Sequence, residues 1–471
     1  MRGDKPWNRA RGLAFLPWQL TAVLAASLCA GAVRADALDD AIRREMQRRQ
    51  VPGVAVVVVK DGRIVREQGY GLANVEHGVP VTPDTMFQSA SVGKTFTAAL
   101  VLLLEKDGKL TLDDPVARHL PGAPAAWQGI TIRHLLTHTS GLGDPYTKID
   151  LRKDYTDEEL IALEAAMPLL FAPGERFAYS NAGYHLLGFI CNRVGGKFFG
   201  EQLKERLFAP LGMGADVISE ADIVAHRAAG YERIDGKLRN QRWVAPSLNR
   251  TADGAIYLSA RDLARWDLAL GGETILDARM KQASWTPPRL ADGSQGPYGY
   301  GWYVGTQNGH RTIQHGGAWQ GFKSVILRYP DDRLSVIVLA NSAAARQGRI
   351  ADLVAAHYVP ALAPTRAPAI ADGKPGSTAR ARRAIGELLA GRVPAGLSDS
   401  ERGRFTQHWV TQIAAEFRDF GALQSVELLA RSSEGARERA RYRFLFENET
   451  MLVSLHLGAN GLIERLGLSL E

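Results

Sequence analysis

The sequence predicts an α+β fold: an antiparallel sheet flanked by helices, with a helical subdomain inserted into the sheet, and a small C-terminal α+β domain after it. Strand patterns occur near the start of the chain, at residues 54–70, and return only at residues 301–339. Between them, residues 110–290 have the periodicity of helices and the composition of loops. This arrangement predicts a functional site between the sheet and the helical part.

The first domain is expected to span residues 38–359. It opens with a helix at residues 38–49, where apolar side chains recur on one stripe. The β-branched run 54–59 and a second strand at 64–70 flank an Asp-Gly pair, which predicts a hairpin. An apolar helix is expected at 92–104 and a closing helix at 346–358. Four late strands are expected at 301–305, 312–314, 323–329 and 334–339.

A second, smaller domain is expected at the end of the chain. Residues 360–377 contain repeated prolines and little apolar periodicity, which is typical of a linker. Residues 378–471 have two helical patterns followed by four strand-like runs, and an Asn-Gly pair predicts a hairpin between the last two. No catalytic motif lies in this part, so we interpret it as an accessory domain.

The N-terminus has the layout of a secretory signal. Basic residues precede an apolar stretch from Leu13 to Val33, and small residues follow around Ala35. This pattern predicts a signal peptide at residues 1–35 and a periplasmic or secreted protein, with no membrane span after cleavage. The alternative is an uncleaved anchor, because the polar residues in the stretch dilute its hydrophobicity without forbidding insertion.

Composition narrows the function classes. The chain has 471 residues, of which 45% are hydrophobic and 23% charged, as in globular proteins of more than one domain. The net charge of +7 comes from scattered basic residues without interleaved aromatics, so nucleic acid is not an expected partner. Only Cys191 lies outside the predicted signal, so burial rather than an internal disulfide is expected to stabilise the fold.

The motif Ser91-Val-Gly-Lys94 pairs a hydroxyl with an amine. Residues three apart lie about one helical turn from each other, so both side chains can share a face. An amine that burial keeps neutral can take the hydroxyl proton, and a helix N-terminus would stabilise the oxyanion. The alternative is an N-cap with a solvated lysine. A nucleotide-binding loop is excluded, because Gln88 stands where that motif needs glycine.

The motif Tyr179-Ser-Asn181 lies just before an apolar helix, so its side chains can enter a cleft. A phenol near cations can have a lowered pKa and can relay protons between the nucleophile and the leaving group. The amide of Asn181 can bind a substrate carbonyl and hold Lys94. The alternative is that the tyrosine packs in the core and the asparagine caps the helix.

The third motif, His315-Gly-Gly317, lies on one of the late strands. Its glycines would let a substrate pair along the strand edge. The N–H of Ala318 would then serve as an oxyanion donor beside the N–H of Ser91. The alternative is a structural histidine, which is the commoner role for a lone histidine near apolar residues.

Two further histidines have the spacing of metal ligands. His134 and His138 are four residues apart on a helical run. The run lacks the glutamate of a His-Glu-x-x-His motif and has no obvious third ligand, so we expect structural roles and no metal.

The three motifs, in this order, resemble those of the penicillin-recognising serine hydrolases, especially the branch of class C β-lactamases, D-alanyl-D-alanine carboxypeptidases and related esterases. Strings at 134–142, 173–181 and 259–265 extend the resemblance over about residues 38–358. The resemblance implies a β-lactamase-like fold, an acyl-enzyme mechanism and no metal or cofactor. By position it makes Ser91 the acylated nucleophile, Lys94 its base partner, Tyr179 the proton shuttle, and Asn181, His315 and Gly317 substrate-binding residues.

One departure affects the expected substrate. β-Lactamases of this type usually carry Lys-Thr-Gly where this chain has His315-Gly-Gly317, which lacks the cation and the hydroxyl that help to bind a carboxylate. We therefore expect an exported serine hydrolase acting on esters or on D-amino-acid amides and peptides. A class C-type β-lactamase and a non-catalytic protein that binds cell-wall peptide are the alternatives. The sequence leaves the oligomeric state open.

Overall fold

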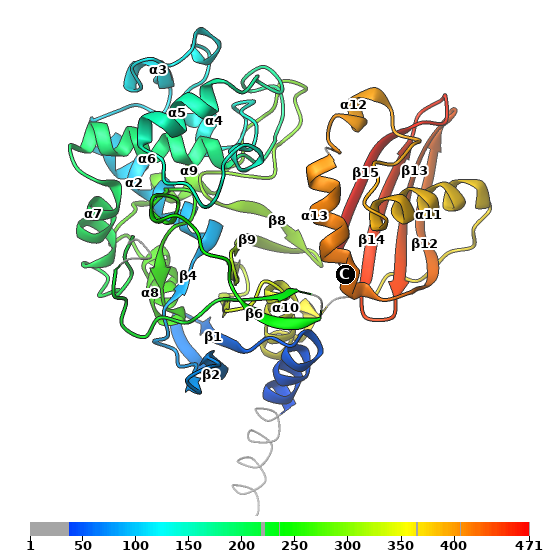
Figure 1. Ribbon diagram of the computed structural model, residues 1–471, viewed down its shortest axis with the longest axis horizontal. Helices are drawn as coiled ribbons and strands as arrows, with labels where there is room; N and C mark the ends of the chain where they lie inside the picture. The colour runs from blue at the N-terminus through cyan, green and yellow to red at the C-terminus, as the bar shows by residue number, and fades with distance from the viewer. Residues whose placement is uncertain (1–36, 218–221, 235, 364–365, 406, 471) are drawn as a thin grey trace, which may run out of the picture. The chain divides into compact units, whose positions relative to one another are not determined.

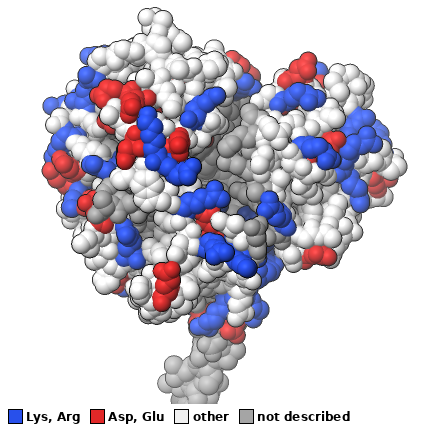
Figure 2. Space-filling view, in the orientation of Figure 1, with Lys and Arg blue, Asp and Glu red and all other residues white. Residues whose placement is uncertain are grey.

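The computed structural model describes residues 37–217, 222–234, 236–363, 366–405 and 407–470 (Figure 1). The predicted signal at residues 1–35 lies outside the described residues. The chain divides into two compact units, Met1–Pro364 and Thr365–Glu471. In the described residues, no helix is both long and apolar enough to cross a membrane. On the face drawn in Figure 2, basic and acidic side chains are interspersed.

The first unit is built on a seven-stranded antiparallel sheet with the strand order β3-β2-β1-β11-β10-β9-β8. The strands are β1 (Gly53–Lys60), β2 (Arg63–Asn74), β3 (Val79–Pro80), β8 (Tyr303–Gln307), β9 (His310–Trp319), β10 (Phe322–Tyr329) and β11 (Leu334–Ala340). Strand β1 pairs with β11, with Val57 opposite Ile337. The first and last strands of the unit therefore meet in one sheet, as the sequence predicts.

Strand β1 is apolar from Val54 to Val59, where both of its faces are buried. Val54, Val56 and Val58 pack into a core that also contains residues of the helix at 37–49 and of α10 (Gln347–Tyr358). The alternate residues of the strand, among them Val57, pack into the larger core on the opposite face. A strand covered on both sides needs no polar alternation, which explains its run of valines.

The helical block lies between β3 and β8 and also contains four short strands, β4 (Phe87–Gln88), β5 (Tyr231–Ile234), β6 (Lys237–Asn240) and β7 (Tyr257–Leu258). Its helices are α2 (Lys94–Lys106), α3 (Val116–His119), α4 (Ile132–Leu136), α5 (Asp157–Ala165), α6 (Asn181–Gly195), α7 (Phe199–Leu203), α8 (Ala260–Gly271) and α9 (Ala278–Ser284). The helix predicted at 92–104 begins two residues later than expected. Residues Ala90–Gly93 form a 3-10 turn, in which Ala90 has a φ of 47°, a value outside the α-helical range.

The second unit is a four-stranded antiparallel meander with helices, as predicted. It contains α11 (Pro375–Leu389), α12 (Asp399–Arg402), α13 (Gln407–Phe417), β12 (Leu423–Glu434), β13 (Arg437–Phe446), β14 (Thr450–Leu457) and β15 (Ile463–Leu470). Its core combines strand residues such as Tyr442 with helix residues such as Ile385. The segment interpreted as a linker, 360–377, includes a 3-10 turn at Pro360–Leu362 and the first residues of α11.

Candidate active site

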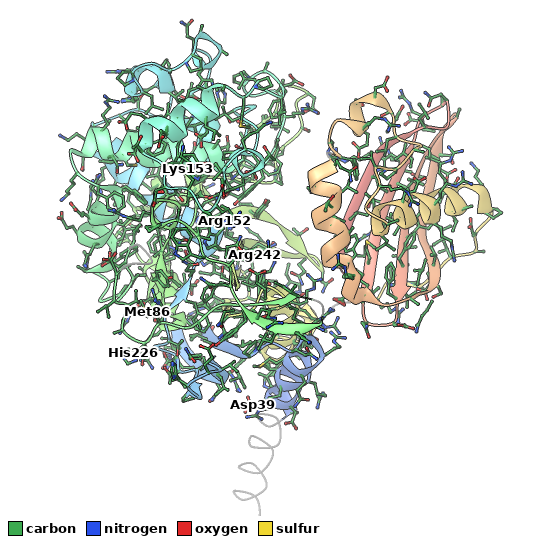
Figure 3. All side chains as sticks on the ribbon, in the orientation of Figure 1. Asp39, Met86, Arg152, Lys153, His226 and Arg242 are labelled. Atoms are coloured by element: carbon green, nitrogen blue, oxygen red, sulfur yellow. The ribbon has the colours of Figure 1, made fainter. Side chains whose placement is uncertain are left out.

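The turn that carries Ser91 is held by main-chain contacts on both sides. Just before it, the N–H of Met86 bonds to the carbonyl of His226 across 2.9 Å (Figure 3). On its other side lies Gly254, where a Cβ would be 2.5 Å from the carbonyl carbon of Ala90 and 3.0 Å from the nitrogen of Ser91. Only glycine permits this approach, so the segment around residue 254 packs directly against the turn and fixes Ser91.

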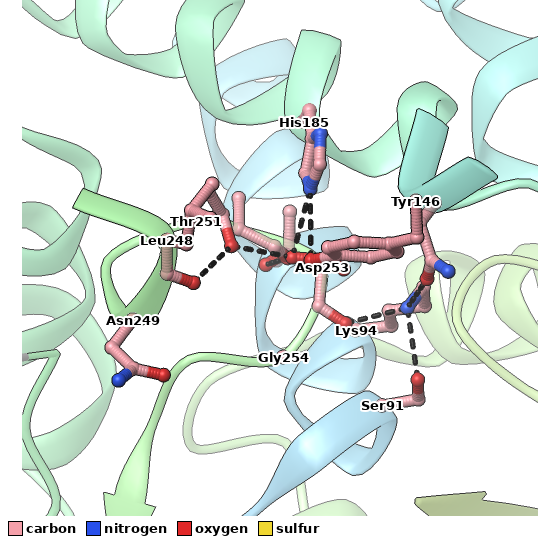
Figure 4. A network of polar contacts seen from close by, with 12 residues as sticks. Ser91, Lys94, Tyr146, His185, Leu248, Asn249, Thr251, Asp253 and Gly254 are labelled. Atoms are coloured by element: carbon pink, nitrogen blue, oxygen red, sulfur yellow. Dashed lines mark hydrogen bonds and ion pairs between the residues drawn. The ribbon is translucent and has the colours of Figure 1, made fainter. Parts of the chain in front are cut away.

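Lys94 lies fully buried beside the serine (Figure 4). Its Nζ lies 3.1 Å from Ser91 Oγ, 2.9 Å from Asn181 Oδ1 and 2.5 Å from the main-chain oxygen of Asp253. Burial lowers the pKa of Lys94 to about 8, although the carboxylates of Asp253 and Asp144 act in the opposite direction. A neutral amine has two protons for the amide and carbonyl oxygens, so its lone pair can accept the proton of Ser91.

Tyr179 is a partly buried neutral phenol whose hydroxyl is enclosed by the protein. Its ring lies 5.0 Å from Lys94 Nζ and packs against His138, with 4.2 Å between the ring centroids. The prediction that nearby cations lower the pKa of Tyr179 is wrong for this site, because burial raises it and the contact with Ser91 offsets only part of that shift. The hydroxyl is buried and makes no hydrogen bond of normal geometry within the described residues.

Asn181 begins α6 and is fixed at both ends of its amide. The oxygen accepts from Lys94, and Nδ2 donates to Asp144 Oδ2 across 3.2 Å. The side chain of Ser180, the residue before it, makes no cap hydrogen bond to the helix. The amide of Asn181 is therefore committed to the site and does not cap the helix.

His315 is a buried residue of β9 that contacts Tyr298. Its Nδ1 lies 2.7 Å from the oxygen of Gly316, and its Nε2 lies 2.8 Å from the hydroxyl of Tyr298. Because a carbonyl only accepts, Nδ1 carries the proton, and Nε2 then accepts from the tyrosine. Burial and Lys94 lower the pKa of His315 to about 3, so the ring is neutral. Both of its nitrogens are thus engaged within the protein, and the side chain supplies no cation.

Gly317 lets β9 lie against the serine turn. A Cβ at this position would be 2.3 Å from Ser324 Oγ and 2.6 Å from the main-chain oxygen of Ser89. Strand β8 pairs with β9 only as far as Gln314, whereas β10 pairs along it to Trp319. In the described sheet, the stretch of β9 that contains Ala318 is thus paired with a strand on one edge only.

Sequence reasoning missed a buried charged network next to Lys94, on the side away from Ser91 (Figure 4). The Nδ1 of His185 lies 2.7 Å from Glu164 Oε1, and its Nε2 lies 3.2 Å from Asp253 Oδ1. Burial alone would lower the pKa of His185, but the two carboxylates outweigh it and raise the pKa to about 10. The same histidine holds the pKa of Asp253 below its usual range despite burial. The available signal was the position of His185, one helical turn after Asn181 on α6.

The two histidines with metal-ligand spacing make separate hydrogen bonds to main-chain N–H groups. His134 accepts the N–H of Thr131 at the start of α4, and His138 accepts the N–H of Ser180 across 3.2 Å. Within the part of the chain that the structure describes, no group of three or more His, Cys, Asp or Glu side chains is arranged to hold a metal ion.

Comparison with known proteins identifies the family. Residues 38–359 match the family described as Beta-lactamase, so the chain belongs to the β-lactamase family and is a serine hydrolase of the group that includes penicillin-binding proteins. Penicillin-binding protein 4* of Bacillus subtilis (strain 168) is 30% identical to it over 323 residues, which are 64% of this chain and 71% of that protein.

Two solved structures are similar in fold. The octameric penicillin-binding protein homologue from Pyrococcus abyssi has a TM-score of 0.61 and 24% identity, and the match covers 93% of this chain and 98% of that one. The D-amino acid amidase from Ochrobactrum anthropi SV3 has a TM-score of 0.56 and 28% identity, over 65% of this chain and 89% of that one. The first match includes both units of the fold. The second covers a share of this chain similar to that of the family match at residues 38–359.

Proposed function

We propose that the protein is an exported hydrolase that forms an acyl-enzyme on Ser91 and acts on esters or on D-amino-acid amides and peptides. The observation that carries this proposal is the distance of 3.1 Å between Lys94 Nζ and Ser91 Oγ. The amine takes the serine proton, and Oγ attacks the substrate carbonyl carbon. Burial, which lowers the pKa of Lys94 to about 8, supplies the neutral amine that this step needs.

The remaining residues have roles in both halves of the reaction. The N–H groups of Ser91 and Ala318 stabilise the oxyanion of the tetrahedral intermediate. When that intermediate collapses, the bond to the leaving group breaks and the phenol of Tyr179 gives its proton to the departing nitrogen or oxygen. The ammonium of Lys94 then passes to the phenol oxygen the proton that it took from Ser91. Water then attacks the acyl carbon while Lys94 takes one of its protons; the bond to Ser91 Oγ breaks, the acid leaves, and this proton passes to Oγ.

The electrostatics of the site support esters and amides over substrates recognised by a carboxylate. His315 is neutral and its nitrogens are engaged, so the third motif offers no cation. The carboxylate of Asp144 lies instead beside Asn181, whose amide is proposed to bind the substrate carbonyl. A substrate amine would be attracted to this position and a carboxylate repelled. The similarity to a D-amino acid amidase supports the same substrate class.

The Ser91→Ala variant tests the function. It is expected to lose turnover of p-nitrophenyl esters and D-amino-acid amides and to lose covalent labelling by a fluorophosphonate, whereas Ser294→Ala, at an exposed serine, keeps both. Labelling of Ser91→Ala at the wild-type rate would overturn the proposal. Faster turnover of nitrocefin than of any ester or amide would favour the β-lactamase alternative, and binding of muropeptides without any acylation would favour the non-catalytic one.

Export and domain organisation complete the proposal. Cleavage of residues 1–35 and delivery to the periplasm or the exterior are proposed from the N-terminal sequence. N-terminal sequencing of the protein recovered outside the cytoplasm tests the cleavage. Residues 378–471 are proposed to be an accessory domain to the hydrolase domain at 38–359.

A further inference from the structure

We propose that Asp253 and His185 form a buried positioning pair that holds Lys94 in place and tunes its basicity, with Glu164 as the outer partner of the histidine. The inference rests on the acyl-enzyme function proposed above. It assigns a part in that function to residues that lie outside the three motifs and that the mechanism does not otherwise use.

Asp253 joins the lysine to the network through two different groups. Its main-chain oxygen lies 2.5 Å from Lys94 Nζ. Its carboxylate accepts the hydroxyl of Thr251 across 2.6 Å and that of Tyr146 across 3.0 Å, and it faces His185. The carboxylate is therefore anchored on three sides, and this anchoring fixes the carbonyl that holds the lysine.

With both facing carboxylates ionised, His185 is doubly protonated. Its side chain is completely buried, and each ring nitrogen faces a carboxylate oxygen, of Glu164 on α5 and of Asp253 in the loop before β7 (Tyr257–Leu258). Burial raises the pKa of Glu164, and the hydrogen bond with His185 lowers it. When both carboxylates are ionised they only accept hydrogen bonds, and because a neutral imidazole has a single donor, only the imidazolium can donate to both. The raised pKa of His185, about 10, agrees with this argument from geometry.

The charges around Lys94 determine how easily it loses its proton. The carboxylates of Asp253 and Asp144 raise the pKa of Lys94. On the other sides lie two neutral phenol rings, of Tyr179 and Tyr184, and two neutral imidazoles, of His138 and His315. The imidazolium of His185 compensates the carboxylate of Asp253. The pair therefore limits how strongly this carboxylate stabilises the lysine ammonium.

Two substitutions are expected to move the pH dependence of Ser91 acylation in opposite directions. Asp253→Asn removes a negative charge near Lys94, so its ammonium is less stable and the rising limb of the profile shifts by about one unit to lower pH. His185→Gln leaves the carboxylate uncompensated, so the limb shifts to higher pH. Damage to packing alone would slow acylation in both variants without shifting the two limbs in opposite directions.

The measurement is the second-order rate constant of fluorophosphonate labelling as a function of pH. This constant reports only on molecules that fold and react, so a reduced folded yield does not alter it. Asp267→Asn is the matched control, because Asp267 is a buried carboxylate that pairs with Arg328 across 2.6 Å and lies outside the network. It is expected to leave the position of the limb unchanged.

A third variant keeps the test independent of the folding of the first two. Glu164→Gln removes the outer negative charge from a side chain that makes no contact with Lys94 among those the structure describes, and it is expected to shift the limb to lower pH. If the rising limbs of the pH profiles of all three variants coincide with that of wild type, or all move in one direction, the positioning pair is overturned. Failure of wild-type protein to be labelled at any pH would instead overturn the acyl-enzyme function itself.

Discussion

Lys94 and Asn181 are 87 residues apart in the chain, yet a hydrogen bond of 2.9 Å joins Nζ of the lysine to Oδ1 of the asparagine. The amide oxygen can only accept, so the lysine donates to it whether charged or neutral. The main-chain oxygen of Asp253 imposes the same requirement. The neutral amine has no third proton, and its lone pair is left to face Ser91.

Lys94→Arg should therefore be nearly inactive. A guanidinium stays protonated at all accessible pH values and cannot take the serine proton, so kcat/KM for an ester is expected to fall at least about 100-fold. Wild-type kcat/KM is expected to rise through a pKa of about 8, and this limb should vanish in the variant. Lys106→Arg, at the exposed end of the same helix, is the control. Wild-type activity in Lys94→Arg would contradict the assignment of the base.

Tyr179→Phe is expected to be less active and more stable. The variant loses the proton relay, which should lower kcat about 100-fold. It also removes a buried hydroxyl without a normal hydrogen bond, which should raise the free energy of unfolding by about 1 kcal/mol. Ester hydrolysis and urea denaturation measure the two effects.

Tyr184→Phe provides the contrast for that prediction. The hydroxyl of Tyr184 donates to the oxygen of Leu136 across 3.0 Å, so its loss should lower stability. Equal stability changes in Tyr179→Phe and Tyr184→Phe would contradict the conclusion that the hydroxyl of Tyr179 lacks a normal hydrogen bond.

Gly317→Ala should impair the site, whereas Gly316→Ala should be tolerated. A methyl group at 317 would overlap Ser324 Oγ at 2.3 Å and the oxygen of Ser89 at 2.6 Å, and would push β9 away from the serine turn. At 316 the nearest atom would be 3.8 Å away, an ordinary contact. We expect a loss of about 1–3 kcal/mol in stability and a lower acylation rate for the first variant only. Equal effects would show that the close approach is unimportant.

His185→Gln should destabilise the protein more at low pH than at high pH. The pKa of His185 is raised from 6.5 to about 10 in the fold, so its contribution to stability is complete below 6.5 and is lost as the pH rises towards 10. Urea denaturation at about pH 6 should give a difference from wild type of a few kcal/mol, and at about pH 9 a smaller one. A difference that does not change with pH would contradict the buried imidazolium.

Much of the fold follows from local patterns. The valines of residues 54–59 form a strand because β-branched residues without polar alternation suit a strand buried on both faces. The Asp-Gly pair after them forms the turn, with a φ of 52° at Asp61 and 72° at Gly62. The start of α2 could not be predicted as closely, because Ala90 has a positive φ where the chain packs against Gly254, and alanine gives no local signal for that conformation.

The sequence alone determined which residues meet at the site, since the order and spacing of the motifs point to Ser91, Lys94, Tyr179 and Asn181. Only the tertiary structure decided their charge states. Burial raises the pKa of the Tyr179 phenol. His315 is neutral and contacts the hydroxyl of Tyr298, and His185 is protonated between two carboxylates. Proton affinity depends on burial and on charges within a few ångströms, and those neighbours come from segments that are far apart in the chain.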